Sequence, residues 1–69
     1  MPNFIASFDG KFYEGPRFRR FFDYSKEVAI RLAKEVAEET GATEIYMEYM
    51  PSGKTVGFWE KKGSRWYKV

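Results

Sequence analysis

The chain contains no cysteine and no histidine. Without cysteine there can be no disulfide bond, no thiol nucleophile and no cysteine-based zinc site. Without histidine the chain lacks the usual general base of hydrolases and the commonest ligand of transition metals. Phosphate-cradling glycine motifs such as G-x-x-x-x-G-K-[ST] do not occur either. We therefore expect no enzymatic activity, no metal, no cofactor and no small-molecule substrate.

Long apolar runs are also missing from the sequence. No run approaches the ~20 residues that a membrane-spanning helix needs, and the N-terminus lacks the charged-then-apolar pattern of a signal peptide. The absence of cysteine is typical of a reducing compartment. These features predict a cytoplasmic protein that does not act at a membrane.

What the 69 residues do contain is a high share of aromatic residues, 20%, and of charged residues, 32%. This length predicts a single domain, residues 1–69. A domain this small buries only about 60% of the surface that its unfolded chain exposes, so each large side chain matters for stability. Apolar residues make up 43% of the chain, which is too many for a disordered tail.

The charges are unevenly distributed along the chain. Residues 1–22 hold four basic and two acidic residues, net +2, and residues 23–50 hold three basic and seven acidic residues, net −4. Residues 51–69 hold five basic residues and one acidic residue, net +4. Two basic ends therefore flank an acidic middle, an asymmetry that bears on partner binding rather than on the fold. The sequence leaves open whether the basic ends meet in space.

Apolar residues recur at helical spacing over residues 24–40, which predicts one amphipathic helix. Asp23 or Ser25 can cap its N-terminus by accepting a hydrogen bond from a free backbone N–H. Gly41 suits the left-handed position beyond the last turn. Alanines lie near the middle of the apolar face, so the helix can approach a sheet closely.

Alternating apolar and polar residues predict strands at residues 4–8, 17–22, 44–50, 55–61 and 65–69. Turn signals end or separate several of them, at Asp9-Gly10, Pro51-Ser52-Gly53 and Lys62-Gly63-Ser64. The order β-β-α-β-β-β predicts an α+β fold, in which an antiparallel sheet of four or five strands packs on one helix.

The chain has more aromatic rings than one helix can cover. Strand alternation predicts that one set of side chains faces the helix: Phe4, Phe8, Phe22, Ile45, Met47, Val56 and Phe58. It turns another set away from the helix: Tyr46, Met50 and Trp59. Only one of Trp66 and Tyr67 can join the core. The outward rings either stiffen a one-sided sheet through cross-strand pairs or form a binding face.

Two groups of charged residues each have a structural and a functional interpretation. Glu44 and Glu48 share one strand face, which favours a solvated surface over a pair of catalytic carboxylates. Arg17, Arg19 and Arg20 lie on one predicted strand. They either protect a sheet edge against aggregation or form a docking patch for an acidic protein or a phosphate.

The candidate binding face combines the outward rings with nearby cations. Its residues are Arg17, Arg19, Arg20, Tyr46, Trp59, Lys61, Arg65, Trp66 and Tyr67. Single-stranded nucleic acid would stack bases on the rings and pair phosphates with the cations, whereas a protein partner would bury Trp, Tyr and Arg as anchors. Because Glu44 and Glu48 share the face of Tyr46 and repel phosphates, the sequence favours a protein partner. A small single-stranded nucleic-acid-binding protein is the alternative.

One further pattern lies within residues 24–69: Ser25, Ala29, Ala33-Lys34, Ile45, Met47 and Gly63-Ser64-Arg65-Trp66. With this pattern the chain resembles a known family of small phage-encoded proteins, the anti-CRISPR proteins. The resemblance is to a type I-F inhibitor with five antiparallel strands around one helix. The resemblance implies an inhibitor that lies against backbone subunits of an RNA-guided effector complex and blocks target DNA from pairing with the guide. We therefore predict a non-enzymatic inhibitor of phage or mobile-element type, which occludes the nucleic-acid-binding surface of a CRISPR effector in the cytoplasm of a bacterial host.

Overall fold

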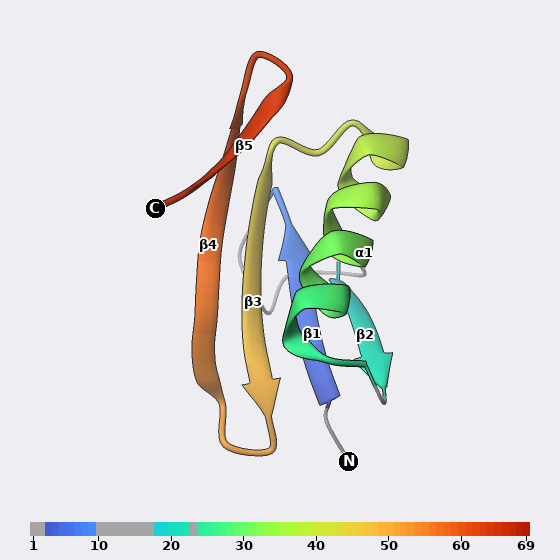
Figure 1. The fold of residues 1–69 in the computed structure, drawn as a ribbon, viewed down its shortest axis with the longest axis vertical. Helices are drawn as coiled ribbons and strands as arrows, with labels where there is room; N and C mark the ends of the chain where they lie inside the picture. Colours follow the sequence, from blue (N-terminus) through green and yellow to red (C-terminus); the bar gives the residue numbers. More distant parts are fainter. Residues whose placement is uncertain (1–2, 10–17, 23) are drawn as a thin grey trace.

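The computed structural model describes residues 3–9, 18–22 and 24–69. Within these ranges there are one helix and five strands, β1 (Asn3–Phe8), β2 (Phe18–Phe22), α1 (Lys26–Thr40), β3 (Glu44–Met50), β4 (Lys54–Lys62) and β5 (Arg65–Lys68). The strands form one antiparallel sheet in the order β2-β1-β3-β4-β5 (Figure 1). The predicted α+β fold and its order β-β-α-β-β-β are confirmed. The predicted turn at Gly10 and the alternative cap Asp23 lie outside the described residues.

The helix α1 has the caps that its sequence predicts. The backbone of Ser25 is extended, and its hydroxyl accepts a hydrogen bond of 3.3 Å from the N–H of Val28. At the other end Gly41 adopts a left-handed φ of 75°, and its N–H bonds to the carbonyl of Ala37. A glycine is favoured there because a Cβ would be penalised at this φ.

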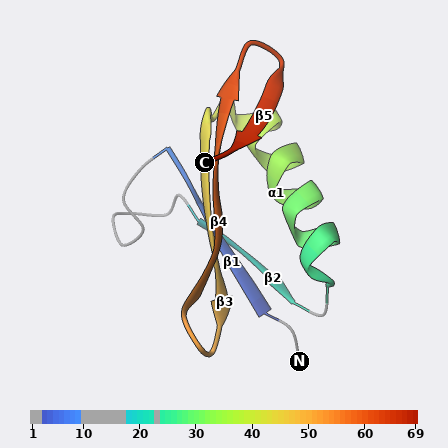
Figure 2. The ribbon, with the colours of Figure 1, turned by 60° about the vertical axis from the view of Figure 1, so that its left-hand side comes forward.

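Figure 2 shows α1 lying on one face of the sheet, and its most extensive contacts are with β1 and β3. Ala29, Ala33 and Ala37 face the sheet and are fully buried. Since alanine has the smallest side chain that still favours a helix, this stripe lets the helix backbone approach the sheet. The larger apolar residues of the core therefore come from the strands.

The core between α1 and the sheet contains Phe4, Ala6, Phe8, Phe21, Ile45, Met47 and Trp59. The prediction that Phe22 faces the helix is wrong. Phe21 pairs with Phe4 across β1 and β2 and is 7% exposed, whereas Phe22 is 54% exposed. Side chains directly opposite each other share a face, so Phe4 places Phe21 in the core and turns its neighbour outward.

The predictions that Phe58 faces the helix and Trp59 faces away are also wrong. Trp59 pairs with Ile45 and is 5% exposed, so it lies in the core, while Phe58 pairs with Tyr46 on the opposite face. Val56 does pack against the core, as predicted. A register shift in the β3–β4 pair breaks the alternation next to Val56, so an inward residue there does not imply an inward Phe58.

In the last hairpin only one of the two adjacent rings contacts the core, as the sequence predicts. Trp66 packs against the core, whereas Tyr67 is 48% exposed.

The side chain of Asp9 ties the end of β1 to the connection between α1 and β3. Its Oδ1 accepts hydrogen bonds from the N–H groups of Thr43 and Glu44, at 2.8 and 2.9 Å, and from the hydroxyl of Thr43 at 3.3 Å. Asp9 has a φ of 48°, a left-handed conformation that aspartate tolerates better than most residues. One side chain thus positions the start of β3 beside the end of β1.

Candidate protein-binding surface

The nine residues of the predicted binding face do not lie together. We call the sheet surface opposite α1 the far face. Four of the nine residues lie on the helix side: Arg19, Trp59, Lys61 and Trp66. Four lie on the far face: Arg20, Tyr46, Arg65 and Tyr67. Arg19 pairs with the core residue Ala6 and so lies on the helix side of the edge strand β2, and Arg17 lies outside the described residues.

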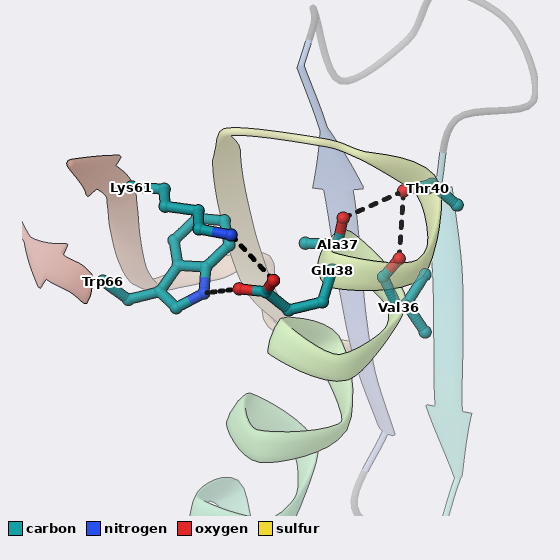
Figure 3. Close-up of polar contacts among 6 residues, drawn as sticks. All are labelled: Val36, Ala37, Glu38, Thr40, Lys61 and Trp66. Atoms are coloured by element: carbon teal, nitrogen blue, oxygen red, sulfur yellow. Dashed lines mark hydrogen bonds and ion pairs between the residues drawn. The ribbon is translucent and has the colours of Figure 1, made fainter. Parts of the chain in front are cut away.

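Trp66 and Lys61 contact the helix through Glu38 (Figure 3). The Lys61 ammonium lies 2.7 Å from Oε2 of Glu38, and the indole N–H of Trp66 donates to Oε1 at 3.2 Å. Lys61 also lies over the Trp66 ring, with Nζ 5.9 Å from the ring centroid. This cluster joins the β4–β5 hairpin to α1, so its Lys and Trp have a structural role.

We expect Glu38→Gln to remove an acid-sensitive part of the stability. The hydrogen bond from Lys61, with that from Trp66 and the Lys61 charge, lowers the pKa of Glu38 below its usual 4.5 in the folded protein. A carboxyl with a depressed folded pKa contributes stability above the unfolded pKa and loses it as the pH falls through the folded pKa. The free energy of unfolding, measured with urea, should therefore fall more steeply below pH 4.5 for the wild type than for Glu38→Gln.

Glu39→Gln is the matched control, because it makes the same change of charge one residue away. It should keep the wild-type dependence on pH. Equal pH slopes for the wild type and Glu38→Gln would contradict a stabilising role for the contact with Lys61.

The ring of Trp59 packs on the helix side of the sheet between Gly57 and the side chain of Lys68. A Cβ built on Gly57 would lie 2.8 Å from Cη2 of Trp59, so the indole occupies the space that a side chain at Gly57 would fill. Lys68 lies on the same side, with Nζ 5.9 Å from the centroid of the Trp59 ring. The ring is therefore enclosed, and it is not available as an anchor for a partner.

Some side chains on the far face are buried, although the sequence predicts an open face there. Ile5 and Ser7 point away from α1, yet they are 6% and 3% exposed. Tyr46 is half-buried, and its hydroxyl contacts Oε2 of Glu48 at 3.1 Å and Oγ1 of Thr55 at 2.8 Å. The centre of this face thus combines a buried isoleucine and a buried serine with a tyrosine whose hydroxyl already contacts its neighbours.

The strand order separates the two basic ends of the sequence. Strands β2 and β5 contain no acidic residue and form the two edges of the sheet, whereas the central strand β3 contains no basic residue. Four strand spacings of about 4.8 Å place the edges roughly 19 Å apart. On the far face Glu44 lies directly opposite Glu60 of β4. The sheet therefore carries positive charge at both edges and carboxylates on its central strands.

Of the predicted cations among the described residues, Arg19, Arg20 and Arg65 are exposed, whereas Lys61 is partly buried and paired with Glu38. No carboxylate of the described residues forms an ion pair with Arg19 or Arg20. Arg20 lies over the ring of Phe22, 5.9 Å from its centroid, and that ring is more than half exposed. Arginine and aromatic side chains are enriched at the anchor positions of protein interfaces. We call Phe18–Phe22, with these side chains, the β2 edge.

Sequence reasoning missed the role of Glu38 and the stacking of Arg20 on Phe22. The second had a local signal, because residues i and i+2 of a strand share a face. The first had none, since Glu38 meets Lys61 and Trp66 only once the hairpin lies beside the helix.

Among the described residues, no three carboxylates come together as ligands of a metal ion would. The helix α1 is not long and apolar enough to cross a membrane. Comparison with protein-family models, with curated proteins and with solved structures found no match to this chain.

Proposed function

We propose that this chain is a non-enzymatic, protein-binding inhibitor of phage or mobile-element type that acts in the bacterial cytoplasm. Its partner would be a subunit of a CRISPR effector complex, whose nucleic-acid-binding surface it occludes. The observation that supports a protein partner is the arrangement of charge in the sheet. A nucleic-acid strand crossing the far face would meet Glu44, Glu48 and Glu60 on the central strands, where sheet-face nucleic-acid binders place their stacking rings.

The resemblance to anti-CRISPR proteins supplies the class of partner. The residues that carry it have structural roles: Ser25 caps α1, Ala29 and Ala33 face the sheet, and Ile45 and Met47 fill the core. They support a similar fold, and the partner itself needs a direct test.

The test is phage infection of bacteria whose active type I-F CRISPR system targets that phage. Expression of the chain should restore plaques, because an occluded effector cannot pair its guide with the phage DNA. Reversing the charge of the β2 edge, Arg19→Glu with Arg20→Glu, should abolish the rescue. Lys54→Glu with Lys62→Glu makes the same change of charge on β4 and should preserve it. A plaque count unchanged by the folded wild-type protein would refute inhibition of this CRISPR class.

The alternative function is binding of single-stranded nucleic acid, which the exposed Arg20–Phe22 pair favours. Both tryptophans lie on the helix side, so fluorescence anisotropy of a labelled oligonucleotide is a better measurement than tryptophan quenching. Micromolar binding that weakens steeply with salt would support this alternative and contradict simple occlusion. No binding at low salt would exclude it.

A further inference from the structure

The two edges of the sheet differ in how readily another strand could pair with them. On the β4–β5 side, β5 pairs only with Trp59–Lys62, so the first half of β4 extends beyond it (Figure 1). This stretch contains the register shift beside Val56 and begins at the exposed Lys54. Bulges, lysines and interrupted edges are the features by which proteins prevent unwanted strand pairing.

The β2 edge has no bulge, no lysine and no interruption in its pairing with β1. Five consecutive residues of β2 pair with β1 without a register shift, from Phe18 with Ser7 to Phe22 with Asn3. No strand of the described residues lies on the outer side of β2, so its outward backbone N–H and C=O groups have no partner strand. The exposed side chain of Phe22 adds apolar surface beside this open edge.

The side chains of the β2 edge indicate the charge of an incoming strand. Arg19 lies on the helix side and Arg20 on the far face, so they project to opposite faces of any strand added beside them. Two consecutive acidic residues in that strand would each meet one arginine. Opposite charges directly across two strands stabilise their pairing, and like charges oppose it.

A second copy of the chain is a poor occupant of this edge. Antiparallel pairing of β2 with itself over its full length would set Arg20 directly against Arg20 of the copy. Pairing with the other edge would bring together β2 and β5, which both carry only basic charges. The charges therefore oppose self-association and favour an acidic partner.

We propose that β2 is the edge to which a partner protein adds an extended acidic segment, by antiparallel backbone pairing alongside Arg19 and Arg20. This inference rests on the proposed protein-binding function and names the surface and the chemistry of the bound segment. Apolar residues would flank the acidic pair of that segment, opposite Phe21 and the exposed ring of Phe22. The backbone pairing supplies the affinity, and the two arginines select for charge.

The test uses the peptide Ac-Thr-Val-Val-Glu-Glu-Val-Thr-NH2, whose two glutamates would lie opposite the two arginines. It is titrated into the isotope-labelled full chain and followed by amide chemical shifts. We expect saturable shifts in β2 and β1, with a dissociation constant of about 1 mM, typical of a weak contact. The same peptide with Lys-Lys in place of Glu-Glu should cause no shifts in β2, and the Arg19→Glu, Arg20→Glu variant should bind at least about tenfold more weakly.

Two N-methylated peptides separate strand addition from simple charge attraction. One is methylated on the N–H groups that would face β2, and the other on those that would face away. Only the first should lose binding, because only those groups bond to β2. Equal binding of the two peptides, shifts confined to β4 and β5, or no shift in β2 would each overturn the proposal.

The outcomes also distinguish this inference from the proposed function. Phage rescue by the wild type with no peptide shift in β2 would support the inhibitor and refute the edge. Saturable shifts in β2 without phage rescue would support the edge and direct the search to another acidic partner.

Discussion

Replacing Trp59 by alanine should lower the free energy of unfolding by about 3–5 kcal/mol, the usual cost of removing a large buried aromatic side chain. Trp59 is 5% exposed, pairs with Ile45 and belongs to the core on the helix side. A single small core rarely supplies more than about 3–5 kcal/mol in a domain of this size. We therefore expect the variant to be largely unfolded at room temperature.

Urea unfolding followed by circular dichroism measures this effect, with Tyr67→Ala as the matched control. Tyr67 is 48% exposed in the neighbouring strand, so its loss should cost about 0.5 kcal/mol or less. If Trp59 were instead an outward binding residue, the alanine variant would remain folded and lose only binding. A wild-type unfolding midpoint for Trp59→Ala would contradict the enclosed position of the ring.

The fold was predictable because its signals are local. Ser25 and Gly41 mark the ends of the helix by their own backbone chemistry, and the alanine stripe marks the face that meets the sheet. Alternation along residues 44–50 places Ile45 and Met47 in the core without knowledge of any partner strand. Each of these assignments depends on a few neighbouring residues, so a single sequence is sufficient for them.

The side of the sheet on which each of two adjacent aromatic side chains lies was not predictable in the same way. Phe21 and Phe22 are adjacent and chemically identical, so only the pairing of β2 with β1 decides which is buried. At Phe58 and Trp59 the register shift changes the alternation inside one strand. The one usable signal was Gly57, because a glycine two residues from a tryptophan leaves room for its ring on the same face.

The candidate site depends on strand order, which sequence patterns determine least. The β1–β3 pair joins segments on either side of β2 and α1, and it places the acidic strand β3 at the centre of the sheet. The basic strands β2 and β5 are consequently separated rather than combined. A binding face that seemed continuous in the sequence is divided between two edges, and of the two tryptophans one is buried and the other is bonded to α1. The proposed binding function therefore rests on the edges of this sheet more than on its rings.

Gly57→Ala should destabilise the protein by about 1–3 kcal/mol, the range for overpacking a filled core. On an ordinary strand the same change is favourable, because glycine weakens strands. Here the new Cβ would lie 2.8 Å and 3.1 Å from Cη2 and Cζ2 of Trp59, and 2.9 Å from Cε of Lys68. Lys68 can move away, since it is a flexible and exposed side chain, but the enclosed indole cannot. The sign of the effect therefore depends on the ring.

A double-mutant cycle with Trp59→Phe tests that dependence. Cη2 and Cζ2 belong to the six-membered part of the indole, which a phenylalanine ring placed on the same Cβ does not reach. Gly57→Ala should cost about 1 kcal/mol less in the Trp59→Phe background than in the wild type, a coupling typical of residues in direct contact. In a Lys68→Ala background its cost should be unchanged. An equal cost in the wild-type and Trp59→Phe backgrounds would show that the indole does not occupy the space above Gly57, and the assignment of Trp59 to the core would then need another explanation.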